Sequence, residues 1–215
     1  MILIYGADGS MGKRYQAILK YLEQPFSTIE IKDDKTVVSE RLEACSRVIL
    51  CTPTDTHYPL LKDIIPVGKP ILCEKPITKA MFELADILNR CETNKTDFNM
   101  TFQYSEFPEV NLTGPDGQQW VTAEPSSYNY FRTGNDGLVW DCLQIIALAK
   151  GEIQLGNDSP IWQCTINGYA LDQSQMDGAY VSFVERWLAG KVSQSHNDLY
   201  KIHDKTERLA NARRS

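Results

Sequence analysis

Residues 1–12 read MILIYGADGSMG, in which a short apolar run breaks abruptly into three glycines spaced G-x-x-G-x-x-G. A continuous run such as Ile2–Tyr5 is typical of a buried parallel strand. In this pattern the first glycine permits a turn at positive φ, the second lets the backbone approach a pyrophosphate, and the third lets the next helix pack on the sheet. Apolar residues at spacings of three and four then predict that helix: Met11, Tyr15, Ile18, Leu19 and Leu22.

The turn and the start of this helix are candidates for binding a dinucleotide cofactor. A diphosphate would rest against the N–H groups and the positive dipole end of the helix. A glycine pattern alone also fits an α/β turn that binds no phosphate, so the residues around it decide between the two readings. The candidate residues of this loop are Gly6, Asp8, Gly9, Ser10, Met11 and Gly12.

An acidic pair follows the next apolar segment. Ile29–Lys32 is predicted to be the second strand, and it ends in Asp33 and Asp34, roughly 20 residues after Gly12. There a dinucleotide-binding fold places the carboxylate that accepts hydrogen bonds from the adenosine ribose, a role predicted for Asp33. A carboxylate would repel a 2′-phosphate, so NAD is favoured, although neighbouring lysines keep NADP open. The alternative is a solvated strand end.

Two further apolar strands end in polar loops at the same predicted edge of the sheet. Arg47–Cys51 runs into T-P-T-D-T-H, and Pro70–Cys73 runs into E-K-P. In open parallel sheets, ligands bind beyond the carboxyl ends of the strands. His57 either hydrogen-bonds a ligand or simply opens the next helix, His57–Val67. The cofactor-binding candidates in these two loops are Thr52, Pro53, Thr54, His57, Glu74 and Lys75.

Lys75 carries the chemistry expected at this edge. It would bring a cationic donor to the nicotinamide side, where it could polarise a hydroxyl or carbonyl group and assist its proton transfer. Glu74 could hold the lysine or the cofactor amide; the alternative is a surface ion pair, which contributes little. Thr78 is predicted to cap a helix through Arg90, and a strand is predicted over Asp97–Tyr104.

The glycine turn, the T-P-T-D-T-H loop and I-L-C-E-K-P-I-T-K occur in the order typical of the Gfo/Idh/MocA oxidoreductase family, which roughly residues 1–108 resemble. The resemblance implies an NAD(P)-dependent dehydrogenase or reductase that acts on sugars, polyols or sugar nucleotides. It places the lysine of E-K-P, Lys75, near the reacting centre. Gln103 and Tyr104 fall where the family's chain leaves the Rossmann domain, as candidates for cofactor and substrate contact.

The second half of the chain departs from the family. Thr133–Asp141 resembles the family's glycine-rich entry to a helix that bears a catalytic D-x-x-x-H or H-x-x-D set, but the histidine is missing. Asp141 is the best candidate for a proton-transferring group, and a partly exposed helix carboxylate fits equally well. Candidate substrate contacts are Arg132, Asn135 and Asp136. The predicted strands are 120–123, 128–133 and 161–169, and the predicted helices are 136–150, 175–189 and 198–213.

Composition sets the class of protein. The 215 residues are 42% hydrophobic and 23% charged, which is ordinary for a globular protein. A net charge of -6 gives no support for binding nucleic acid or an anionic membrane. No signal peptide or bilayer-spanning segment is predicted. The six cysteines lack metal-ligand spacing, so no metal is expected, and they are taken as reduced core residues of a cytoplasmic protein.

The fold expected is α/β: a Rossmann doubly wound parallel sheet over residues 1–104, followed by a truncated α+β domain over residues 105–215. Family members usually build a broad, mostly antiparallel sheet there, and this chain has too few residues for all of it. A homodimer is therefore expected to have a reduced surface. The function expected is hydride transfer between NAD(H) and a carbohydrate-like small molecule. The alternative is a non-catalytic NAD-binding sensor or scaffold, which the missing histidine favours and the intact E-K-P opposes.

Overall fold

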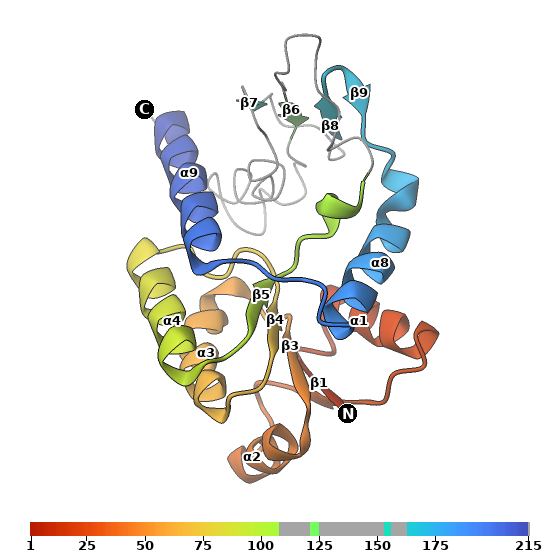
Figure 1. Cartoon of the computed structure of the whole chain (residues 1–215), viewed down its shortest axis with the longest axis vertical. Coiled ribbons are helices and arrows are strands. Elements are labelled where there is room, and N and C mark those ends of the chain that lie inside the picture. Colours follow the sequence, from red (N-terminus) through yellow and green to blue (C-terminus); the bar gives the residue numbers. More distant parts are fainter. Residues whose placement is uncertain (108–120, 125–152, 156–162, 215) are drawn as a thin grey trace. The chain divides into compact units, whose positions relative to one another are not determined.

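The computed structural model describes residues 1–107, 121–124, 153–155 and 163–214 (Figure 1). The chain forms two compact units. The first unit comprises residues 1–101 and 184–200, and the second comprises residues 102–183 and 201–215. None of the helices in the described ranges has both the length and the apolar character needed to cross a membrane.

The first unit is built on a five-stranded, all-parallel sheet with the strand order β2-β1-β3-β4-β5. Its central strands are continuous apolar runs that the helices on both faces bury, as parallel sheets require. The chain moves outward from β1 to β2 and then returns past β1 to β3, so the strand order reverses between β1 and β3. The strands are β1 (Ile2–Tyr5), β2 (Phe26–Ile29), β3 (Arg47–Leu50), β4 (Ile71–Cys73) and β5 (Phe98–Met100).

Helices cover this sheet on two sides: α1 lies on one side, and α3 and α4 lie on the other (Figure 1). The buried face of α1 holds Gly12, Tyr15, Ile18 and Leu19, at the spacings of three and four that predicted this helix. The helices are α1 (Ser10–Tyr21), α2 (Lys35–Ala44), α3 (His57–Ile64) and α4 (Met81–Asn94). The predicted Rossmann doubly wound sheet is thereby confirmed.

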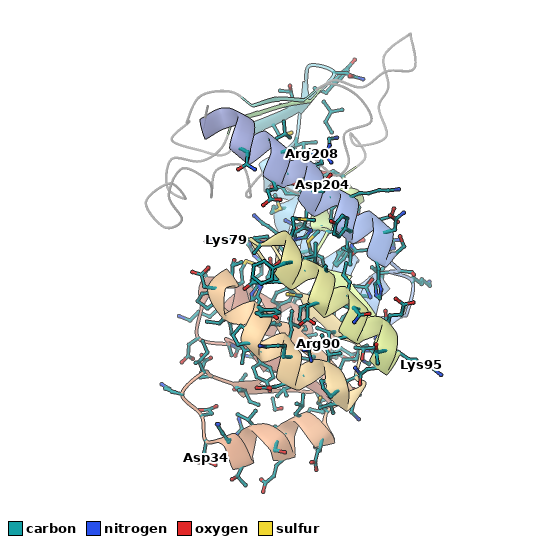
Figure 2. The ribbon with its side chains drawn as sticks, turned by 90° about the vertical axis from the view of Figure 1, so that its left-hand side faces the viewer. Asp34, Lys79, Arg90, Lys95, Asp204 and Arg208 are labelled. Atoms are coloured by element: carbon teal, nitrogen blue, oxygen red, sulfur yellow. The ribbon has the colours of Figure 1, made fainter. Side chains whose placement is uncertain are left out.

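Three local predictions in the first half of the chain were wrong. The strand predicted over 97–104 covers only Phe98–Met100, because the chain turns into a 3₁₀ helix at Gln103–Glu106. The second strand covers Phe26–Ile29, because the Glu30 N–H donates to the Asp33 carboxylate at 3.0 Å and closes a turn that leaves Ile31 59% exposed. Thr78 does not cap α4, since its hydroxyl donates to the Ala80 carbonyl at 3.1 Å and the helix begins at Met81. Figure 2 shows Asp34 at the start of α2 and Lys95 at the end of α4.

Residues 184–200 complete the first unit from the far end of the sequence. The Gln194 carboxamide lies along β5: its oxygen accepts from the Met100 N–H at 2.7 Å, and its nitrogen donates to the Met100 carbonyl at 2.9 Å. The Arg47 guanidinium donates to the Leu188 carbonyl at 3.1 Å and lies over the Trp187 ring at 5.2 Å. A side chain thus occupies hydrogen-bonding positions that a further strand would take.

The second unit contains a four-stranded sheet with the order β7-β6-β8-β9, in which only β6 and β7 are parallel. The predicted strand 161–169 is in fact two strands joined by a turn at Asn167 and Gly168. The predicted strand 128–133 and helix 136–150 lie outside the described residues. The remaining elements are β6 (Val121–Glu124), β7 (Ile153–Leu155), β8 (Gln163–Ile166), β9 (Tyr169–Ala170), α8 (Met176–Leu188) and α9 (His196–Arg214).

An apolar cluster forms the core of this second unit, with Tyr104 and Phe107 stacked at 5.6 Å between ring centroids. Its members are Tyr104, Phe107, Cys164, Ile166, Leu171 and Ala179, with Met176 packed against them. The small sheet and the accompanying helices confirm a reduced α+β part after the Rossmann sheet.

Candidate cofactor and active site

Two glycines of the β1–α1 turn are required by the protein's own packing. Gly6 has a φ of +83°, and a Cβ there would lie 2.9 Å from the Thr52 side chain. A Cβ on Gly12 would lie 2.2 Å from the Gly6 carbonyl oxygen and 2.5 Å from the Ala7 Cα. Those atoms belong to the backbone and cannot move aside. Gly12 therefore allows α1 to begin directly against the turn that follows β1.

Gly9 differs from both. Its φ is -69°, which any residue can adopt, and the nearest atom to an added Cβ would be the Gly6 oxygen at 3.4 Å, an ordinary contact. Gly9 is the N-cap of α1, where no side chain caps the helix and the first turn holds no acidic residue. The first N–H groups and the positive end of the helix dipole are therefore suited to an anion, and the glycine keeps that approach clear.

The backbone of this turn binds the carboxylate of Glu30, which sequence reasoning missed. The Asp8 N–H donates to Glu30 Oε1 at 2.7 Å, directly after the last residue of β2. The Asp33 carboxylate accepts a hydrogen bond from the Glu30 N–H. The signal was in the sequence, because Glu30 follows Gly12 by 18 residues and a strand that ends at Ile29 would have placed it at the sheet edge.

The loop after β3 begins with Thr52, Pro53 and Thr54. Thr52 is buried. The Thr56 hydroxyl oxygen lies 2.8 Å from the hydroxyl oxygen of Thr52 and 2.7 Å from the Pro53 carbonyl oxygen. These contacts close a short 3₁₀ turn over Thr54–Thr56. An exposed ion pair of 3.4 Å between Lys79 and Asp55 joins this turn to the loop after β4.

His57 opens α3 and is 1% exposed. Its Nε2 lies 2.8 Å from the Thr52 carbonyl, and its Nδ1 lies 3.1 Å from the carbonyls of both Pro76 and Ile77. Burial lowers the pKa of His57, and the hydrogen bonds to these carbonyls oppose that shift. Because both ring nitrogens face backbone carbonyls, the arrangement favours a role in joining the two loops over contact with a ligand.

The E-K-P turn holds a buried carboxylate. Glu74 is 6% exposed; it accepts the Tyr15 hydroxyl at 2.6 Å on one oxygen and the Lys75 N–H at 3.2 Å on the other. The Tyr15 oxygen also lies 2.8 Å from the Thr101 hydroxyl. Glu74 is therefore not part of an exposed surface ion pair; it is held from two sides at the end of β4.

Backbone hydrogen bonds bring these loops to one edge. They continue the strand pairing past the strand ends, from the Gly6 N–H to Ile29 and from the Glu74 N–H to Leu50. The first unit thus brings together the glycine turn, Glu30, the loop after β3 and E-K-P. Gln103 and Tyr104 are buried in the second unit, where Gln103 Nε2 lies 3.9 Å from Met176 Sδ. The predicted residues outside the described ranges are Arg132, Asn135, Asp136 and Asp141.

The thiols of the described cysteines offer little reactivity. All of these cysteines are buried: Cys45, Cys51, Cys73, Cys91 and Cys164. Burial raises the pKa of the Cys91 thiol to about 12. Within the described ranges, no three His, Cys, Asp or Glu side chains gather as metal ligands.

Residues 5–102 match the model of the Gfo/Idh/MocA family, described as an oxidoreductase family with an NAD-binding Rossmann fold. No curated protein matches the chain significantly.

Solved structures share the fold at low sequence identity. The WlbA (WbpB) dehydrogenase from Thermus thermophilus, in complex with NAD and UDP-GlcNAcA, aligns with a TM-score of 0.73 and 11% identity over 97% of this chain and 94% of its own. A myo-inositol dehydrogenase from Corynebacterium glutamicum aligns with a TM-score of 0.67 and 13% identity, over 95% of this chain and 93% of its own. The UDP-N-acetylglucosamine 3-dehydrogenase GnnA from Acidithiobacillus ferrooxidans aligns with a TM-score of 0.73 and 12% identity, over 98% of this chain and 96% of its own.

Proposed function

Because residues 5–102 match the model of the Gfo/Idh/MocA oxidoreductases, with its NAD-binding Rossmann fold, we propose that the protein is an NAD-dependent dehydrogenase or reductase. Its substrate would be a small carbohydrate-like molecule: a sugar, a polyol or a sugar nucleotide. The observation that carries the proposal is the contrast among the glycines. Gly6 and Gly12 are required for packing. The protein itself would accommodate a side chain at Gly9, so the glycine there is explained by the approach of a ligand.

The cofactor would be held along the edge that begins at α1. The N–H groups of Ser10, Met11 and Gly12 would bind its diphosphate, and Glu30, in place of the expected Asp33, would accept hydrogen bonds from the adenosine ribose. A carboxylate at that position disfavours a 2′-phosphate, which supports NAD over NADP. When bound, the nicotinamide supplies the hydride acceptor or donor.

The reacting centre would lie by E-K-P. In the strand order β2-β1-β3-β4-β5, the β4 end is on the opposite side of β1 from β2, where a dinucleotide site places its second half. The Lys75 ammonium would donate to the substrate oxygen and polarise the C–O bond. Asp141 would exchange the proton with that oxygen. Further cofactor and substrate contacts proposed are Thr52, Pro53, Thr54, Gln103, Tyr104, Arg132, Asn135 and Asp136.

The class of substrate is supported by the proteins of similar fold. One was solved with NAD and UDP-GlcNAcA, another is a myo-inositol dehydrogenase, and a third acts on UDP-N-acetylglucosamine. The sugar or cyclitol rings named with these proteins all carry hydroxyl groups, which is the kind of group that the Lys75 ammonium is proposed to polarise. A homodimer and a cytoplasmic location are proposed with it; the thiols of the described cysteines suit a reducing compartment.

A fluorescence titration with NADH, and separately with NADPH, tests the cofactor site. We expect NADH affinity on the order of micromolar, which Gly9→Trp abolishes because the indole blocks the approach to α1. The matched control is Gly178→Trp at an exposed position of α8, where a Cβ meets nothing within 4 Å; this variant should bind NADH normally. Absence of NADH and NADPH binding by the wild-type protein would overturn the proposal.

Lys75→Ala separates an enzyme from a protein that only binds NAD. Against a panel of sugars, polyols and sugar nucleotides, we expect the variant to lose turnover by at least about 100-fold while its NADH affinity changes little. Wild-type NADH binding without turnover on any panel member would favour a sensor or scaffold.

A further inference from the structure

A buried chain of hydrogen bonds joins three separate elements of the first unit. Tyr15 on α1 is fully buried; its hydroxyl lies 2.6 Å from the Glu74 carboxylate after β4 and 2.8 Å from the Thr101 hydroxyl after β5. Thr101 is also fully buried, and its hydroxyl lies 3.3 Å from the Cys73 carbonyl. Tyr15 and Thr101 are fully buried and Glu74 is 6% exposed, so these polar groups depend on one another and on the backbone for their hydrogen bonds.

The direction of these bonds follows from their chemistry. A carboxylate only accepts, so the Tyr15 hydroxyl must give its single proton to Glu74. The Thr101 hydroxyl has one proton, which it can give either to the Tyr15 oxygen or to the Cys73 carbonyl. The other oxygen of Glu74 accepts the Lys75 N–H at 3.2 Å. The carboxylate is thereby fixed between a side chain of α1 and the backbone of the lysine proposed to contact substrate.

The same helix carries the proposed phosphate site. Tyr15 and Gly12 both lie on the buried face of α1, and the helix begins at Ser10, next to the N-cap Gly9. A diphosphate seated at this end and the E-K-P turn are therefore connected through one side chain. Without the tyrosine proton, the buried carboxylate would need another donor and would shift, together with the Lys75 backbone that it binds.

We infer that Tyr15 is a positioning residue. It fixes the position of the E-K-P turn relative to the phosphate-binding helix α1, so that Lys75 is held at a defined position relative to the nicotinamide half of the cofactor. The inference rests on the proposed function. It predicts that the tyrosine hydroxyl matters for the nicotinamide half of the cofactor and not for the adenylate half, which binds on the other side of β1.

Tyr15→Phe tests this inference, with NADH and ADP-ribose as probes. ADP-ribose keeps the adenylate half and the diphosphate but lacks the nicotinamide. We expect about tenfold weaker NADH binding, as for the loss of a charge-assisted hydrogen bond, and less than about twofold change for ADP-ribose. The matched control is Tyr58→Phe, which removes a phenol-to-carboxylate bond of 3.1 Å to Asp86 between α3 and α4. It should change neither affinity.

A second pair of variants tests whether Tyr15 acts through Glu74. In a Glu74→Gln background, Tyr15→Phe should add little further loss of NADH affinity, since the carboxylate that it positions is gone. Fully additive losses would overturn the inference. Should Tyr15→Phe fail to fold by circular dichroism, Thr101→Val decides, because it removes the hydroxyl that lies 2.8 Å from the Tyr15 oxygen and should weaken NADH binding selectively but less.

The outcomes distinguish the two proposals. Equal weakening of NADH and ADP-ribose by the folded Tyr15 variant, or no weakening of either, would overturn the positioning role while leaving the cofactor site in place. No binding of NADH by the wild-type protein would instead overturn the proposed function itself, and with it the inference.

Discussion

The two sheets of this chain are stabilised in different ways. In the five-stranded sheet, strands β1 and β4 are wholly buried, and the loops at their carboxyl ends depend on backbone geometry and on buried polar groups such as Glu74 and His57. The four-stranded sheet ends in an exposed strand, β9, with Tyr169 64% exposed, and its unit is held by an apolar cluster. The nucleotide site should therefore depend on single positions of the first sheet and not on the core of the second.

The largest effect is expected from Gly12→Ala. Its Cβ would lie 2.2 Å from a backbone oxygen, so either α1 or the turn after β1 must move. We expect a loss of more than about 5 kcal/mol in the free energy of unfolding, which places it among the exceptional single substitutions. Urea denaturation followed by circular dichroism measures it. Gly9→Ala is the control, with a loss within about 1 kcal/mol; similar losses for both would end the contrast between these glycines.

Phe107→Ala comes next and tests whether the units are separable. Phe107 is 1% exposed in the second unit, stacked on Tyr104. Its truncation should cost about 3–5 kcal/mol through the lost burial and the cavity left behind. NADH affinity should stay within about twofold, because every residue assigned to the phosphate and ribose sites lies in the first unit. Loss of NADH binding in a variant whose first unit remains folded would contradict the separation.

His57→Phe is expected to cause a smaller loss of unfolding free energy than Phe107→Ala, and this loss should depend on pH. The variant removes the one N–H of the neutral imidazole, so the carbonyl or carbonyls on one side of the ring, Thr52 on one and Pro76 and Ile77 on the other, lose their donor, at a cost of about 1–3 kcal/mol. Burial lowers the pKa of His57 from its ordinary value of 6.5, so the unfolded chain takes up a proton first on acidification. The wild-type protein therefore loses stability below about pH 6.5, and the variant does not share this loss. The gap in unfolding free energy should narrow as pH falls; a gap that widens would contradict the neutral state of the folded histidine.

The comparison also explains what the sequence could reveal. The first sheet was predictable because β1, β3 and β4 contain continuous apolar runs and the loops that follow them carry local motifs. The second strand was misplaced because Ile31 is apolar yet exposed, held outside by the Glu30–Asp33 turn. That error drew the prediction to Asp33 and away from Glu30, whose carboxylate accepts the Asp8 N–H.

The second sheet was less predictable, because its pairings join residues far apart in the sequence and no single motif records them. One local signal was present and missed. Asn167 and Gly168, with φ of 52° and 82°, form the Asn-Gly turn that joins β8 to β9, and this dipeptide between apolar residues is a strong sign of a hairpin. The Asn-Gly dipeptide could therefore have prevented the prediction of one continuous strand over residues 161–169.

The smallest effect is expected at Asp34, and it sharpens the distinction between the acidic residues after β2. Asp34 is exposed at the N-cap of α2, where its carboxylate accepts the Thr36 N–H at 2.8 Å (Figure 2). That hydrogen bond lowers the pKa of Asp34 below its ordinary value of 3.8. Asp34→Ala should lower Tm by about 2–4 °C at neutral pH and leave NADH affinity unchanged, in contrast to Glu30→Ala, which should weaken it.

The pH dependence of this effect follows from the sign of the shift. Because the folded carboxyl has the lower pKa, its stabilisation is complete well above pH 3.8 and disappears as pH falls through the folded value. Thermal melts of the wild-type protein and Asp34→Ala should therefore converge between about pH 5 and about pH 3. Asp34→Asn keeps a capping oxygen without a titrating group, so its Tm should stay near the wild-type value at neutral pH and exceed it at low pH. A constant difference between the wild type and Asp34→Ala across this range would show that the cap hydrogen bond does not depend on the charge of the carboxylate.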